Sequence, residues 1–167
     1  MKKLLVLAAV VAGIFTAGAM EFKIECEKFT TKSEGVGNGG IGSSSNADLL
    51  LFRAAKGGTA TAKFDIPETQ RYYVWVRDYS MNGKTRRGTI SINNRKVGTF
   101  GDMPANDNHK QWCWTKAPFP VKLEAGEAEI KIDGRYNCRF DVIYFTDDPN
   151  AKPQGTMPDV PEIEPLD

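Results

Sequence analysis

Two short stretches of this sequence combine residue types that can do chemistry. The first, YYVWVRDY (residues 72–79), has the period-two alternation of a β-strand. One face of that strand is ordinary apolar core. The opposite face is aromatic with one cation, and its members are Tyr73, Trp75, Arg77 and Tyr79. Such a face is either a second packed layer or a surface that holds a ligand.

The second stretch is IECEKF (residues 24–29), in which two acidic residues alternate with core-type residues. Glu25 and Glu27 are two positions apart, so a regular strand would place both carboxylates on one face. Ile24 and Cys26 would then face the core. The acidic pair is either a set of cation ligands or solvated charge on an edge strand.

More aromatic candidates lie in two loops. Trp112 and Trp114 end a long polar loop (residues 101–114), and in an extended chain they point to the same side. Tyr136 and Asn137 belong to the loop DGRYN. Each of these rings either caps the core or takes part in binding.

No catalytic set stands out among the remaining residues. The only histidine, His109, lies in a polar loop, and the nearby Cys113 lacks the strand-to-helix setting that activates a nucleophile. Carboxylates are plentiful, but no spacing singles out an acid–base pair. The sequence therefore indicates a protein without an active site.

The elements that position these residues are short strands with turn residues between them. About nine strands and no helical pattern predict an all-β fold, an antiparallel β-sandwich of the jelly-roll kind. We expect Asn93 and Asn94 to form a hairpin turn, and we expect a second hairpin between residues 121–123 and 128–132. One domain should span residues 20–149, followed by a proline-rich acidic tail at 150–167.

The chain begins with the features of an export signal. Lys2 and Lys3 precede an apolar run, and small residues at 17–19 form a cleavage site, so residues 1–19 are expected to be a signal peptide. An uncleaved membrane anchor is the alternative, although the run is short for a membrane span. Removal of Lys2 and Lys3 leaves 20 basic and 21 acidic side chains. This balance gives no bulk attraction to nucleic acid or to an anionic membrane surface. We expect no nucleic-acid partner and no membrane insertion of the mature chain.

Three cysteines lie in the expected mature chain: Cys26, Cys113 and Cys138. In an oxidising compartment two of them can pair. Cys138 could reach either of the others. Because Cys26 shares the core register of Ile24, we favour a Cys113–Cys138 disulfide, with Cys26 as a buried thiol.

The strand motifs also resemble those of a known group of domains. The segments occur in the order IECEKF (24–29), FDIP (64–67), YYVWVR (72–77), LEAGEAEIKI (123–132) and DVIYFTDDP (141–149). This pattern resembles β-sandwich carbohydrate-binding modules related to families 6 and 35, which are attached to secreted bacterial enzymes that act on polysaccharides. The resemblance covers nearly the whole expected mature chain.

The resemblance implies a calcium site and a sugar site. Related modules hold a structural calcium ion between a first-strand E-x-E and a last-strand aspartate, which are Glu25, Glu27 and Asp141 here. Aromatic rings stack on the apolar faces of sugars while polar groups bond the hydroxyls. The candidate ligand-binding residues are Tyr73, Trp75, Arg77, Tyr79, Trp112, Trp114, Tyr136 and Asn137.

These implications lead to three functional hypotheses. The first is an exported, non-catalytic module that binds a polysaccharide or glycan. The second is a structural or adhesion sandwich that contacts another secreted or cell-surface protein. The third is a polysaccharide lyase or glycosidase.

Overall fold

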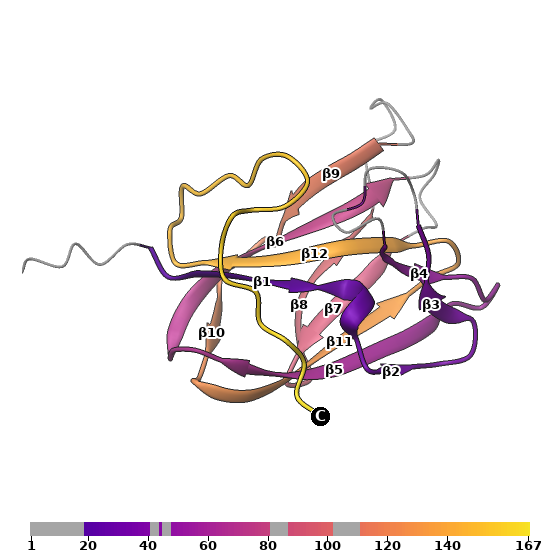
Figure 1. Cartoon of the computed structure of the whole chain (residues 1–167), viewed down its shortest axis with the longest axis horizontal. Coiled ribbons are helices and arrows are strands. Elements are labelled where there is room, and N and C mark those ends of the chain that lie inside the picture. Colours follow the sequence, from indigo (N-terminus) through magenta and orange to yellow (C-terminus); the bar gives the residue numbers. More distant parts are fainter. Residues whose placement is uncertain (1–18, 41–43, 45–47, 81–86, 102–110) are drawn as a thin grey trace, which may run out of the picture.

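The computed structural model describes residues 19–40, 44, 48–80, 87–101 and 111–167. Within these residues the chain forms twelve strands in two antiparallel sheets that pack face to face (Figure 1). The predicted all-β sandwich is therefore confirmed. Nearly all of the expected signal peptide, and His109, lie outside the described residues. Among the described residues, no helix is long and apolar enough to cross a membrane.

The larger sheet has seven strands and carries most of the candidate residues. Its centre is β6 beside β12. On the far side of β6, β10 and β9 pair with successive parts of that strand, and on the far side of β12, β1 and β4 do the same. The strands are β1 (Glu21–Glu25), β3 (Val36–Asn38), β4 (Leu50–Phe52), β6 (Gln70–Ser80), β9 (Gln111–Lys116), β10 (Val121–Leu123) and β12 (Arg139–Thr146).

The smaller sheet has five strands in the order β2-β5-β11-β7-β8. Its strands are β2 (Thr31–Lys32), β5 (Gly58–Ile66), β7 (Gly88–Ile92), β8 (Arg95–Phe100) and β11 (Gly126–Gly134). Buried and exposed positions alternate along β5 and β11, as expected for strands with one face on the core.

The core lies between the sheets and follows the predicted alternation. Tyr72, Val74 and Val76 of β6 are fully buried and belong to it, together with inward residues of β5 and β11. The hairpin turn at Asn93 and Asn94 is also confirmed. Both residues have positive φ, 49° and 62°, which a type I′ turn between β7 and β8 requires.

Two glycines on neighbouring strands make room for rings from the opposite sheet. Gly88 and Gly134 are register partners. A Cβ on Gly88 would come within 2.6 Å of the Phe140 ring, and one on Gly134 would come equally close to Phe52. The two phenyl rings pack edge to face against each other, with centroids 6.1 Å apart. This packing helps to fix the start of β12 against the smaller sheet.

The described part of the chain has twelve strands rather than nine because three segments gave no strand signal. β2 and β3 have two and three residues, which is too short to show a period. β9 contains Trp112 and Trp114, which the sequence placed at the end of a loop. The composition of residues 101–114 is polar, and that masked the strand.

The predicted second hairpin is wrong. β10 pairs with β6 and β11 pairs with β5, so the chain passes from one sheet to the other between them. Leu123 and Ile130 do contribute to one core, but from opposite sheets. Both arrangements bury the same apolar positions, so periodicity alone could not separate them.

The predicted Cys113–Cys138 disulfide is not formed in the structure. Cys113 lies on β9 and Cys138 directly precedes β12, and β6 runs between these strands. Strands separated by a third lie about 10 Å apart, which is beyond the Cα separation that a disulfide spans. Cys26 is buried as expected.

The segment after β12, residues 147–167, is extended and packs on the sandwich; we call it the tail. It loops beside β6 and β9, passes in front of β12 and β1, and ends near β5 (Figure 1). Single bridges join Glu162 to Lys23 of β1 and Pro165 to Phe64 of β5. The tail therefore contacts both sheets.

Candidate functional site

Three carboxylates meet at the junction of β1 and β12; we call them the carboxylate cluster. β1 ends at Glu25, and a 3₁₀ turn, η1 (Cys26–Lys28), brings Glu27 back toward it. Asp141 sits at a bulge in β12, where the register with β6 shifts between Phe140 and Val142. One oxygen from each of Glu25, Glu27 and Asp141 lies within 4.8 Å of the others. The turn replaces the regular strand that the sequence suggested, but the three residues are brought together.

The carboxylate cluster is buried, and its electrostatics are unusual. Glu25 and Asp141 are fully buried and Glu27 is 8% exposed. Burial raises the pKa of Glu27 to about 7, with the charges of Glu25 and Asp141 adding to the rise. Among the described residues, Glu27 Oε2 has no hydrogen-bond partner. A buried carboxylate oxygen without a partner is costly, so this position favours a cation.

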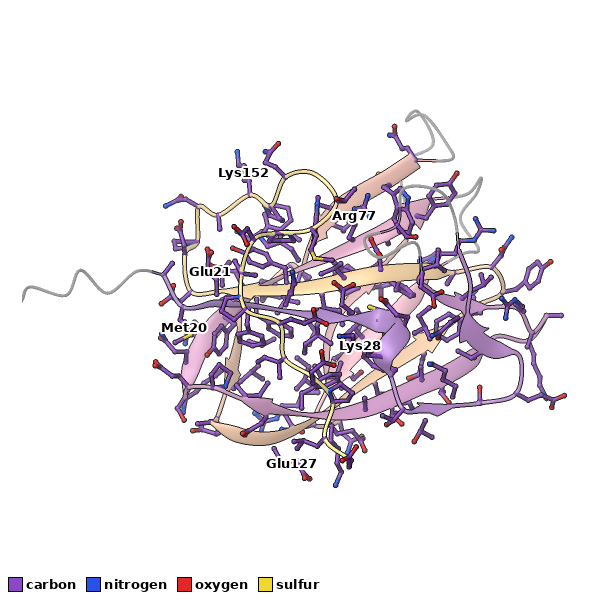
Figure 2. All side chains as sticks on the ribbon, viewed as in Figure 1. Met20, Glu21, Lys28, Arg77, Glu127 and Lys152 are labelled. Atoms are coloured by element: carbon purple, nitrogen blue, oxygen red, sulfur yellow. The ribbon has the colours of Figure 1, made fainter. Side chains whose placement is uncertain are left out.

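Arg77 connects the carboxylate cluster to the aromatic residues. Its guanidinium bonds the Asp141 carboxylate and lies over the Trp112 ring, 4.5 Å from the ring centroid. Arg77 is labelled in Figure 2. Arg77 is only 4% exposed. As placed, it orients Asp141 and Trp112 and is not open to a ligand from solvent.

The aromatic candidates lie on the side of the seven-stranded sheet that faces away from the core; we call this side the outer face. The register pairs Tyr79 with Trp112, Arg77 with Trp114 and Trp75 with Lys116. Side chains of paired residues project to the same side, so β6 and β9 present one continuous set. Tyr144 of β12 joins it, with its ring 6.4 Å from that of Trp114.

One half of the outer face is occupied by a cation and by the tail. Lys116 Nζ lies 4.6 Å from the Tyr73 ring centroid and 5.4 Å from that of Trp75. The same ammonium donates to the Pro149 carbonyl, and Trp114 Nε1 donates to the Gly155 carbonyl. These rings therefore already have partners on the outer face.

The other half of the outer face lies next to the loop before β12. We call it the open end; it comprises Tyr79, Trp112, Asn137 and Arg139. Tyr79 and Trp112 pack edge to face with centroids 5.2 Å apart, and both are half-buried. The Arg139 guanidinium lies 5.4 Å from the Tyr79 centroid and donates to Asn137 Oδ1 at 3.3 Å. Asn137 adopts a left-handed turn conformation, with φ of 66°. The preceding Tyr136 is 50% exposed.

The eight predicted ligand-binding residues thus fall into three groups by their position in the structure. Tyr79, Trp112 and Asn137 meet at the open end, with Tyr136 next to Asn137 in the chain. Tyr73, Trp75 and Trp114 lie in the half that Lys116 and the tail occupy, and Arg77 is buried beneath Trp112. Sequence reasoning missed the roles of Lys116 and Arg139. The alternation of Lys116 with Trp114 and Trp112 would have indicated the first, had β9 been recognised.

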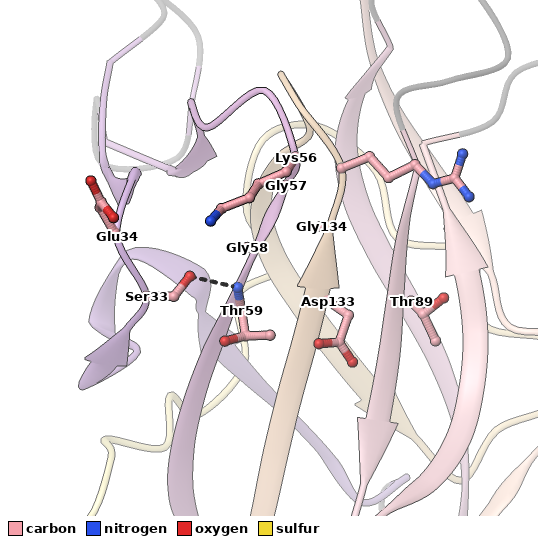
Figure 3. Close-up of a pocket in the computed structure, with 10 residues that line it drawn as sticks. Ser33, Glu34, Lys56, Gly57, Gly58, Thr59, Thr89, Asp133 and Gly134 are labelled. Atoms are coloured by element: carbon pink, nitrogen blue, oxygen red, sulfur yellow. Dashed lines mark hydrogen bonds between the residues drawn. The ribbon is translucent and has the colours of Figure 1, made fainter.

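A separate polar cleft of about 640 Å³ lies at one end of the five-stranded sheet (Figure 3). Thr59, Asp133 and Thr89 come from three adjacent strands and line its floor, where Ser33 Oγ accepts a hydrogen bond from Thr59 N at 2.9 Å. Lys56 and Arg135 also line the cleft. Described residues of this cleft include no aromatic side chain. Its composition is that of a solvated sheet end.

Comparisons with known proteins identify the fold. No protein-family model matches the sequence, and no curated protein is significantly similar to it. Among solved structures, a family 35 carbohydrate-binding module from Clostridium thermocellum matches with a TM-score of 0.60 and 12% identity. The match covers 76% of this chain and 98% of that one.

Two family 6 modules match over similar lengths. The C-terminal module of a marine laminarinase from Zobellia galactanivorans has a TM-score of 0.59 and 15% identity, covering 77% of this chain and all of that one. A module of lichenase 5A from Cellvibrio mixtus, solved with cellotriose, has a TM-score of 0.54 and 17% identity, covering 75% and 96%. The expected resemblance to families 6 and 35 is confirmed for the fold.

Proposed function

We propose that this chain is an exported, non-catalytic protein that binds a glycan at the open end of its outer face. The proposal gives no residue a catalytic role. The ligand is a polysaccharide or a glycan chain, and no nucleic acid is involved.

One observation carries this proposal: the grouping of Tyr79, Trp112, Arg139 and Asn137. The two rings offer apolar surface at an interplanar angle of 71°, which suits the C–H faces of a sugar. The guanidinium and the amide of Arg139 and Asn137 lie beside them and can bond hydroxyl groups. Half-buried rings with adjacent polar groups are typical of small-ligand sites.

The similar solved structures support the proposal. They are carbohydrate-binding modules, and the module of lichenase 5A was solved in complex with cellotriose. Because their identity to this chain is low, they suggest a ligand class but do not identify the sugar.

We further propose that the carboxylate cluster holds a structural calcium ion. Glu25, Glu27 and Asp141 supply hard oxygen ligands, and calcium prefers such ligands. The cation would bond Glu27 Oε2 and offset the excess negative charge that Arg77 only partly neutralises. It would tie β1 to β12 and so help to hold the outer face.

A glycan screen of the mature chain tests the proposed function. We expect binding to one class of glycan, and we expect Trp112→Ala or Tyr79→Ala to weaken it by about 1–3 kcal/mol, by analogy with base–aromatic stacking. Thr99→Ala, on the exposed side of β8, is the matched control and should bind as wild type. Melting curves check that each variant is folded. A folded Trp112→Ala variant with unchanged affinity would remove the open end from the proposal.

A further inference from the structure

The tail behaves as a bound segment on the outer face. Its first part, residues 149–158, which we call the strap, runs over the half of the face that contains Trp75 and Trp114 (Figures 1 and 2; Lys152 of the strap is labelled in Figure 2). Two side-chain hydrogen bonds from β9 to the strap, those of Trp114 and Lys116, both go to main-chain carbonyls. In these bonds the strap supplies the acceptors, and side chains of β9 supply the donors.

The donors that bond the strap are the kind that bind sugars. Trp114 Nε1 donates to Gly155 O at 3.1 Å, and Lys116 Nζ donates to Pro149 O at 2.8 Å. An indole N–H beside a ring face, and an ammonium held over two rings, are suited to hydroxyl oxygens as well as to carbonyl oxygens. Trp75 Nε1 is a third such donor, buried without a partner among the described residues.

The composition of the strap suits it to aromatic surface. Pro149, Pro153 and Pro158 restrict its backbone, so it loses little conformational entropy on docking. Proline also lacks an N–H, and this reduces the number of donors that docking would leave unsatisfied. Extended proline-rich segments dock in aromatic grooves in this way.

The strap is also held in place by contacts with β1 and η1, one of which is the hydrogen bond from Lys23 Nζ to Pro158 O at 3.2 Å. Lys23 N donates to Pro161 O and Ile163 N donates to Lys23 O, each at 2.9 Å. The Ile163 side chain packs against the core. The Lys28 ammonium pairs with the carboxylates of Glu162 and Glu164. Changes at these anchors can release the strap without altering any ring of the face.

We propose that the strap is an internal ligand that occupies a second half-site for a linear glycan. The half-site comprises Tyr73, Trp75, Trp114 and Lys116, and it continues the open end along β6 and β9. With the strap docked, only the open end binds sugar. With the strap displaced, a longer chain can span both halves. This inference rests on the proposed function of the open end.

A release variant, Glu162→Lys/Ile163→Pro/Glu164→Lys, tests the inference in the full-length mature chain. It reverses both charges that face Lys28 and removes the Ile163 N–H. The matched control is Glu127→Lys, which reverses one charge of an exposed ion pair with Lys63 on the other sheet. A second release variant replaces residues 149–166 with a Gly-Ser segment of equal length.

Two measurements are made on each variant. Acrylamide quenching of tryptophan fluorescence reports release, and it should rise in the release variants but not in the control. Affinity is then measured for short and long oligosaccharides of the class found in the screen. We expect release to tighten binding of long chains roughly fivefold or more, with short chains unchanged.

The outcomes separate this inference from the proposed function. Increased quenching with unchanged affinity for long chains would refute the inference and leave the open end intact. Quenching at the wild-type level in both release variants would show that the strap does not shield the rings, and this would also refute it. If neither wild type nor variants bind any glycan, the proposed function fails and the inference fails with it.

Discussion

The two sheets use charge differently on their outer sides. On the five-stranded sheet, Lys63 pairs with Glu127 at 2.8 Å, and both side chains are more than half exposed. On the seven-stranded sheet, the pair of Arg77 and Asp141 has side-chain exposures of 5% and 0%. The first pair comes from strands that alternate between buried and exposed positions, whereas Asp141 sits at the bulge in β12.

The difference shows that the charges of one sheet lie in solvent and those of the other are buried. Exposed threonines and ion pairs keep the five-stranded sheet soluble and gain little energy. Buried charges are expensive unless they are paired or bind an ion, so their presence on the other sheet points to a role beyond solubility. The predictions below test whether the unusual energetics reside in the seven-stranded sheet.

The largest expected effect is a pH dependence that comes from Asp78 of β6. Burial raises its pKa to about 7, although Thr115 Oγ1 donates to its carboxylate at 2.9 Å. The unfolded chain releases this proton near pH 3.8 and the folded chain only near 7. The contribution of Asp78 to stability is therefore fully present below about pH 4, and it falls by roughly 3–4 kcal/mol as the pH rises to 7.

Denaturant titrations between pH 4 and 7.5 measure this fall. Because Glu27 should contribute in the same direction, the comparison is made in a Glu27→Gln background, with and without Asp78→Asn. The asparagine should flatten the profile. Glu127→Gln, on the other sheet, should leave it unchanged. An equally steep profile in the Asp78→Asn variant would show that other groups cause the pH dependence of stability.

The next effect is the response to calcium. A ligand that binds only the folded state at a hundredfold excess over its Kd adds about 2.7 kcal/mol of stability. We expect a chelator to lower the Tm of the wild type, and we expect Glu27→Gln to lose most of this response. Glu129→Gln, on the five-stranded sheet, is the control and should respond as wild type. A wild-type melting curve that ignores the chelator would rule out a structural calcium ion.

A smaller effect should come from the contact between the sheets. Gly88→Ala places a methyl group against the Phe140 ring, and overpacking of this kind costs about 1–3 kcal/mol. Phe140 precedes Asp141, so the shift should also weaken the calcium response. Thr89→Ala, one residue away on the outer side, should change stability little. The measurement is thermal unfolding with and without chelator. A Gly88→Ala variant as stable as the wild type would show that the rings can move aside.

The smallest effect should distinguish two surface ion pairs. Glu162→Gln weakens the partly buried contact with Lys28 and should cost about 0.5 kcal/mol at low salt. Glu127→Gln should have no measurable effect, because its pair with Lys63 is open to solvent. Unfolding titrations at low and high salt compare the two. Equal effects would mean that the tail anchor is no stronger than an ordinary surface pair.

Residues with strong alternation were the ones whose placement the sequence could predict. Tyr72, Val74 and Val76 face the core because period-two patterns report burial directly. The hairpin at Asn93 was predictable because only turn residues tolerate its backbone angles. The wrong hairpin at Leu123 arose because burial does not specify which strand is the neighbour.

The candidate site was less predictable because it depends on contacts distant in sequence. The carboxylate cluster came together as the resemblance implied, through a turn and a bulge that alternation does not reveal. In the sequence, Lys116 and Arg139 look like ordinary surface cations. Only the positions of β9 and β12 show that they lie over aromatic rings. The hydrogen bond from Trp114 to Gly155 depends on where the tail docks, and composition alone does not predict that position.

The tail also bears on self-association. Lys23 of β1 and Lys63 of β5 lie on strand edges, and unpaired edges recruit strands from other molecules. Pro161 O accepts the Lys23 amide proton, and Leu166 N donates to Lys63 O at 2.7 Å. Because Pro161 and Pro165 have no N–H, the segment that covers these edges is a poor template for a further strand. By covering these edges, residues 161–166 should disfavour edge-to-edge aggregation of the sandwich.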